Sequence, residues 1–100
     1  SGRPRSAEEE LSRALVREAR RLAIRIDEIG AALASQEARI SQLESLFSSP
    51  DQFEDATVLA TSGEQYLTLK KDAQSLWEEW ERLSLEAEKT DSRLGELKAI

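Results

Sequence analysis

The sequence predicts an all-α fold, an antiparallel two-helix coiled-coil hairpin with a short, partly helical linker. Two runs of apolar residues repeat at alternating steps of four and three, which is typical of the seam of a left-handed coiled coil. The two runs are nearly equal in length, and Pro50 lies between them. Because proline lacks the N–H that a helix interior needs, this arrangement favours a hairpin over one continuous helix.

Each predicted seam holds ten positions, and nine of the ten in each are apolar or aromatic. The first seam consists of Leu15, Ala19, Leu22, Ile26, Ile29, Leu33, Gln36, Ile40, Leu43 and Phe47. The second consists of Tyr66, Leu69, Ala73, Leu76, Trp80, Leu83, Ala87, Thr90, Leu94 and Leu97. The polar members, Gln36 and Thr90, are candidates for fixing the register of the two helices at some cost in stability.

Helix-start signals set the expected boundaries. A capping box opens at Ser6 and a second at Ser62, where a serine hydroxyl can accept a hydrogen bond from a free backbone N–H. Proline is tolerated in a first helical turn, so Pro50 indicates a short turn of helix inside the linker. The expected organisation is a disordered basic leader (1–5) and a hairpin (6–100) built from helix 6–48, linker 49–61 and helix 62–99.

Composition argues against an enzyme. The 100 residues include no cysteine and no histidine and carry a net charge of −6, so thiol chemistry and the usual neutral-pH proton shuttle are absent. A two-helix hairpin offers no cleft that would shift a carboxyl pKa for acid–base work. No apolar run approaches the ~20 residues of a membrane span. We therefore expect a cytoplasmic domain with no catalytic residue, cofactor, metal or membrane contact.

Positive charge is concentrated near the start of the chain. Residues 1–25 hold seven arginines and four glutamates, a net of +3, whereas the remaining residues have a net charge of −9. Arginines at steps of four and three form an exposed stripe on one helix face, and such a stripe can bind a phosphate backbone. The alternative is that they form ion pairs with acids of the same or the facing helix. The candidate nucleic-acid-binding residues are Arg13, Arg17, Arg20, Arg21 and Arg25.

The two tryptophans are expected to differ in role. Trp80 falls on the second seam and is predicted to fill the core, whereas Trp77 lies one position off the seam, on its flank. A flank tryptophan on a thin hairpin is a candidate contact for another protein. A second copy of the chain is also a candidate partner, because two hairpins paired as a four-helix bundle would bury more apolar surface. The oligomeric state stays open.

Three motifs between Ile40 and Leu83 resemble those of a known family. They are I-x-x-L-E from Ile40, P-x-x-F-x-D from Pro50 and W-E-x-L from Trp80. Together they resemble the C-terminal coiled-coil domain of ABC-F ATPases, including the Uup type. The resemblance implies a soluble parent protein with tandem ATPase domains that acts on the ribosome in translation. It implies that this domain is a non-catalytic accessory arm that contacts its own ATPase domains and, through its basic end, ribosomal RNA or other nucleic acid.

Two other classes of helical hairpin remain alternatives. A structural or protein-interaction coiled coil, spectrin-like or a tether segment, is suggested by the W-x-x-L-x-x-x-A spacing that begins at Trp80. The helical hairpins of release factors and seryl-tRNA synthetases are a more distant choice.

Overall fold

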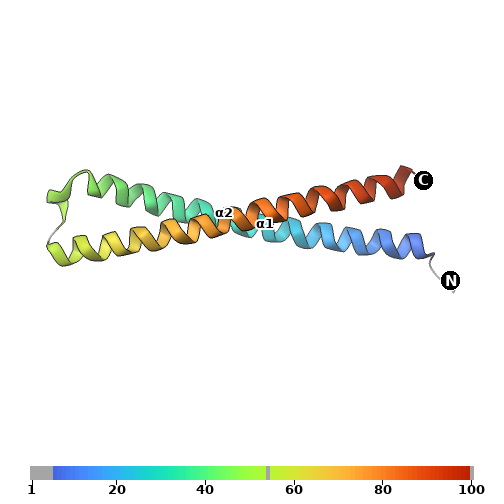
Figure 1. Cartoon of the computed structure of the whole chain (residues 1–100), viewed down its shortest axis with the longest axis horizontal. Helices are drawn as coiled ribbons and strands as arrows, with labels where there is room; N and C mark the ends of the chain where they lie inside the picture. Colours follow the sequence, from blue (N-terminus) through green and yellow to red (C-terminus); the bar gives the residue numbers. More distant parts are fainter. Residues whose placement is uncertain (1–5, 54, 100) are drawn as a thin grey trace. The chain divides into compact units, whose positions relative to one another are not determined.

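The computed structural model describes residues 6–53 and 55–99. It confirms the predicted fold class: the chain is all-α, and two long helices pack antiparallel against each other as a hairpin (Figure 1). The elements are α1 (Ala7–Phe47), the short 3-10 helix η1 (Pro50–Gln52) and α2 (Ala56–Ala99). The leader expected at 1–5 lies outside the described residues. No helix in the described ranges is long and apolar enough to cross a membrane.

Contacts divide the chain into two compact units, and each helix contributes a segment to both. The first, here the terminal unit, comprises residues 6–28 of α1 with its cap and 80–99 of α2. The second, here the bend unit, comprises residues 29–53 and 55–79, which include the connection between the helices. Each unit has its own buried seam.

The terminal unit buries its seam almost throughout. Leu22 has no exposed surface, and Leu15 and Leu83 are also buried. Thr90 is buried too, and its hydroxyl donates to the backbone carbonyl of Glu86 at 3.0 Å, so this polar seam residue is satisfied within its own helix. The exception is Trp80, which keeps 36% of its surface exposed. The prediction that Trp80 would fill the core was therefore wrong in this respect, because the indole is too large to be covered fully here.

The bend unit buries every one of its seam positions at least partly. Ile29 and Leu43 are fully buried, and Ile40 is 8% exposed. Gln36 interrupts this apolar row, and its side-chain oxygen is buried without a hydrogen-bond partner among the described residues. A buried carbonyl oxygen without a partner loses its hydration and gains nothing in return, so it lowers stability.

Aromatic side chains pack against one another at the connection between the helices. The Phe47 ring at the end of α1 stacks on Phe53 with centroids 5.8 Å apart, and it meets Tyr66 of α2 edge-on at 5.5 Å. Farther along, Arg39 of α1 donates to the side-chain oxygen of Gln65 at 2.9 Å. These contacts fix the cross-helix register that the sequence alone leaves open.

The start of α2 differs from the expectation. The helix begins at Ala56, six residues before the expected start at Ser62, so residues 56–61 belong to α2 and not to the linker. The cap is Asp55, whose carboxylate accepts from the backbone N–H of Val58 at 2.9 Å, which is the usual geometry of a helix N-cap. The helix then continues through Gly63, although glycine costs about 1 kcal/mol relative to alanine in a helix.

The other boundary signals agree with the structure. At the start of α1, the backbone N–H of Glu9 donates to the Ser6 hydroxyl at 3.1 Å, as the capping box predicts. The helix ends at Phe47, one residue from the expected end. The short helical turn expected at Pro50 is η1.

Replacing Gln36 with leucine should stabilise the hairpin by about 1 to 2 kcal/mol, since the substitution removes a buried oxygen without a partner and adds apolar burial. Urea unfolding followed by circular dichroism measures the change. Ser41→Leu is the control, because Ser41 is exposed on the same helix and its replacement should change stability by less than about 0.5 kcal/mol. Equal or lower stability of Gln36→Leu would contradict this account.

Asp55→Ala should destabilise the chain by about 1 kcal/mol, because the N–H of Val58 loses the oxygen that caps α2. The same urea experiment measures it. Asp51→Ala serves as the control, since it removes one exposed acid from the same connection without touching that cap. A similar loss of stability in both variants would show that the removal of a negative charge, and not the loss of the cap, destabilises the chain.

Candidate nucleic-acid interface

All five candidate arginines lie on the α1 segment of the terminal unit, and all five are exposed. Helical geometry explains this placement, because the seam takes the inward positions and leaves the arginines on the outer positions and the flank. The structure separates them into two sets. Arg21 and Arg25 have carboxylate partners on α1, whereas Arg13, Arg17 and Arg20 do not.

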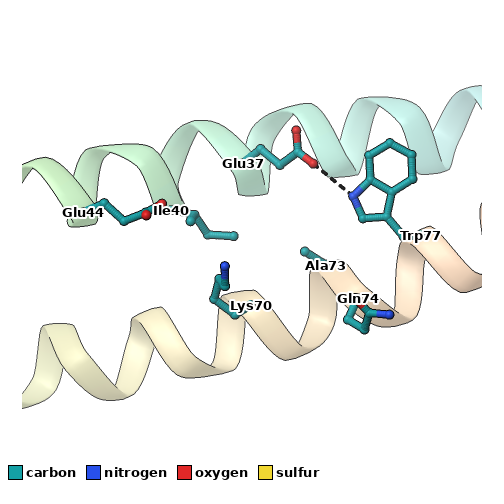
Figure 2. Close-up of a pocket in the computed structure, with 7 residues that line it drawn as sticks. All are labelled: Glu37, Ile40, Glu44, Lys70, Ala73, Gln74 and Trp77. Carbon is teal, nitrogen blue, oxygen red and sulfur yellow. Dashed lines mark hydrogen bonds between the residues drawn. The ribbon is translucent and has the colours of Figure 1, made fainter.

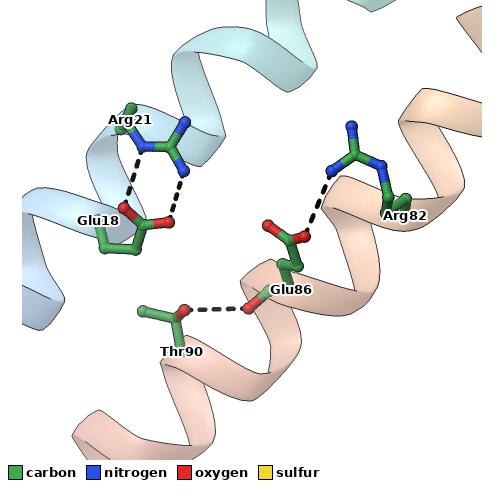
Figure 3. Close-up of polar contacts among 5 residues, drawn as sticks. All are labelled: Glu18, Arg21, Arg82, Glu86 and Thr90. Atoms are coloured by element: carbon green, nitrogen blue, oxygen red, sulfur yellow. Dashed lines mark hydrogen bonds and ion pairs between the residues drawn. The ribbon is translucent and has the colours of Figure 1, made fainter.

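Arg21 forms an ion pair with Glu18, one helical turn earlier. Its guanidinium donates two hydrogen bonds to the Glu18 carboxylate, at 3.0 Å from Nε and 2.6 Å from the terminal nitrogen (Figure 3). These hydrogen bonds, together with the positive charge of Arg21, lower the pKa of Glu18, and they raise the pKa of Arg21 in turn. Arg25 contacts Glu28 similarly at 3.2 Å. The alternative that the sequence left open, ion pairing with acids of the same helix, is therefore found at Arg21 and Arg25.

Arg13, Arg17 and Arg20 present a continuous basic stripe, here the arginine stripe. They line one shallow depression together with Ser12 and Val16. Within residues 6–53 and 55–99, none of the three makes an ion pair. Arg20 also borders a second depression, which Asp27 and Asp91 line.

The acids of the facing helix do not neutralise the arginine stripe. Glu86 of α2 is engaged by Arg82 of the same helix at 3.3 Å (Figure 3). Among the described residues, no ion pair joins Glu88, Asp91 or Glu96 to an arginine of α1. Within residues 6–53 and 55–99, Arg13, Arg17 and Arg20 therefore form none of the cross-helix ion pairs that the sequence left open.

Trp77, the candidate for protein interaction, lies on α2 in the bend unit and is 42% exposed. Its indole N–H donates to the carboxylate of Glu37 on α1 at 3.0 Å (Figure 2). Sequence reasoning missed Glu37, although one signal could have found it. Once Phe47 is placed opposite Tyr66, counting along both helices puts the flank of Trp77 beside Glu37.

The site contains no arrangement that points to bound metal. In the described ranges, no three side chains of the metal-ligating types that this chain contains gather closely enough to hold an ion. Its chemistry is that of a charged, solvent-facing surface.

Comparisons with protein-family models, with curated proteins and with solved structures gave no significant match. The resemblance to ABC-F coiled-coil domains therefore depends on the motif residues alone.

The pKa of Glu18 should rise toward the ordinary glutamate range in an Arg21→Gln variant, since the hydrogen bonds that lower it are removed. Because the folded pKa is the lower one, the interaction stabilises the fold above the unfolded pKa and is lost as pH falls through the folded pKa. Carboxyl carbon chemical shifts followed by NMR against pH measure this. Arg25→Gln is the control and should leave Glu18 unchanged, and an unaltered Glu18 titration in Arg21→Gln would refute the assignment.

Proposed function

We propose that this chain is a non-catalytic accessory arm of a cytoplasmic ABC-F ATPase and that it contacts ribosomal RNA or other nucleic acid through the arginine stripe. The observation that carries the proposal is the exposure of Arg13, Arg17 and Arg20 without ion-pair partners in the described part of the chain. Three guanidiniums on one helix face form a strip of positive charge on a chain whose net charge is −6. Guanidiniums bind phosphate groups through paired hydrogen bonds.

The chemistry of the stripe favours contact with the backbone of a double helix. No aromatic residue precedes Phe47 in the sequence, so the α1 segment of the terminal unit has no ring on which an unpaired base could stack. Proteins that prefer single strands depend on such rings. A stripe of arginines without them recognises phosphates by charge, with little dependence on base sequence.

The linker motif supports the ABC-F part of the proposal. Phe53 stacks on the end of α1, and Asp55 caps α2. The residues that carry the P-x-x-F-x-D resemblance are thus the ones that build the bend.

Replacing Arg13, Arg17 and Arg20 together with glutamine should weaken binding to a 20-base-pair RNA duplex. The slope of log K against log salt should become shallower by about 3, since each phosphate contact contributes about 0.9. Fluorescence anisotropy across a salt series measures both quantities. The control variant, Lys71→Gln with Lys89→Gln and Lys98→Gln, removes the same charge from exposed positions of α2 and should retain most of the affinity. Equal affinity and equal slope in the wild type and the arginine variant would exclude the stripe as the site.

The ABC-F assignment has a separate test. The reading frame that encodes this chain should also encode two phosphate-binding loops of the form G-x-x-x-x-G-K-[ST], one for each ATPase domain. A frame without them would overturn the assignment and leave the binding result for the stripe unaffected.

A further inference from the structure

A small hollow in the bend unit combines an aromatic ring with carboxylates. Its floor is apolar and its rim is charged (Figure 2). The residues that define it here, as the Trp77 hollow, are Ile40, Ala73, Glu37, Glu44, Lys70 and Trp77. Ala73 lies one helical turn before Trp77, and its short side chain leaves space at this seam position.

The ring of Trp77 is held in place from the opposite helix. The hydrogen bond from its indole nitrogen to Oε1 of Glu37 is 3.0 Å long and joins α2 to α1. A tryptophan that is 42% exposed would otherwise have several orientations. Fixing the ring lowers the conformational entropy that a ligand would have to overcome on binding.

The charges around the hollow favour a cation. Glu37 accepts one hydrogen bond at Oε1, and its second oxygen has no hydrogen bond from any described residue. The Glu44 side chain also has no ion-pair partner in the described ranges. Lys70 is the single basic residue on the rim, and its ammonium lies 5.8 Å from the centre of the Tyr66 ring. The described residues of the bend unit include eight acids and three bases, a net of −5.

We propose that the Trp77 hollow binds an arginine side chain from a basic segment of a partner protein. A guanidinium is flat, stacks on an indole face and donates paired hydrogen bonds to a carboxylate, whereas the lysine ammonium is a compact, strongly hydrated point charge. Glu37 and Glu44 repel phosphate, so the hollow does not serve nucleic acid. Its two apolar floor residues, Ile40 and Ala73, are buried and offer little surface to an apolar side chain.

The test uses a Trp80→Phe variant, in which Trp77 is the only tryptophan. A short peptide containing two arginines is titrated in, with lysine and citrulline versions of the same peptide for comparison. Trp77 emission should shift with the arginine peptide, and the affinity should fall about two- to five-fold for lysine and further for uncharged citrulline. Equal responses to the arginine and citrulline peptides would overturn the proposal.

Two substitutions locate the site. Glu37→Gln keeps an acceptor for the indole N–H but removes the charge, and it should weaken arginine-peptide binding about two- to five-fold, as should Glu44→Gln. Glu64→Gln, which makes the same charge change at an exposed position outside the hollow, should bind as tightly as the parent. A loss of the same size in Glu64→Gln would show general charge attraction only and would exclude the hollow.

Two further results would contradict the proposal, one by identifying a different partner and one by excluding the Trp77 hollow as the site. A Trp77 emission that changes with protein concentration before peptide is added would identify a second copy of the chain as the occupant. If Trp80→Phe does not fold, the indole N–H resonances of the unaltered chain distinguish the two tryptophans by NMR. The Trp77 resonance should then be the one that moves on titration, and movement confined to Trp80 would refute the site.

Discussion

Burial of a single apolar seam is the constraint on which the rest of this structure depends. A hairpin has no third layer, so each helix can hide only the residues that recur at steps of four and three, such as Leu22 and Leu43. Everything off the seam faces water or sits on its flank. Both sites proposed above accordingly lie off the seam, on the outer arginine stripe and at the flank position of Trp77. In residues 6–53 and 55–99, the solvent-facing surface presents charged side chains and the partly exposed indoles of Trp77 and Trp80.

Contacts at the bend determine which residues of the two helices lie opposite each other in the bend unit. Phe47, at the end of α1, contacts both Phe53 in the connection and Tyr66 on α2. With this contact made, residues along the bend unit fall opposite each other at fixed positions. The hydrogen bond between Trp77 and Glu37 is one result. A shift by one residue would move a whole seam off its partner, so the aromatic contacts and the apolar seam specify the same pairing.

Much of the fold could be predicted because the seam leaves a strong periodic signal. The bend, the exposure of the arginines and the cap at Ser6 follow from the same reasoning. The start of α2 could not be predicted as easily, since both Ser62 and Asp55 are good capping residues and nothing local chooses between them. The aromatic contacts of Phe53 favour the shorter connection. Trp80 shows another limit of prediction from sequence. A heptad position predicts that a side chain points toward the facing helix, but it does not predict whether a large indole there is fully covered.

The uneven distribution of charge along the chain bears on the nucleic-acid contact proposed above. Residues 26–100 carry a net of −9, and this charge repels nucleic acid from a distance. At physiological ionic strength the repulsion is screened over about 8 Å, whereas a guanidinium in direct contact with a phosphate is screened much less. Glu18 and Glu28 neutralise Arg21 and Arg25 locally, which narrows the attractive surface to three arginines. Under the function proposed above, a polyanion is held only where it reaches the arginine stripe itself, and the acidic bend unit is left to partners of the opposite charge.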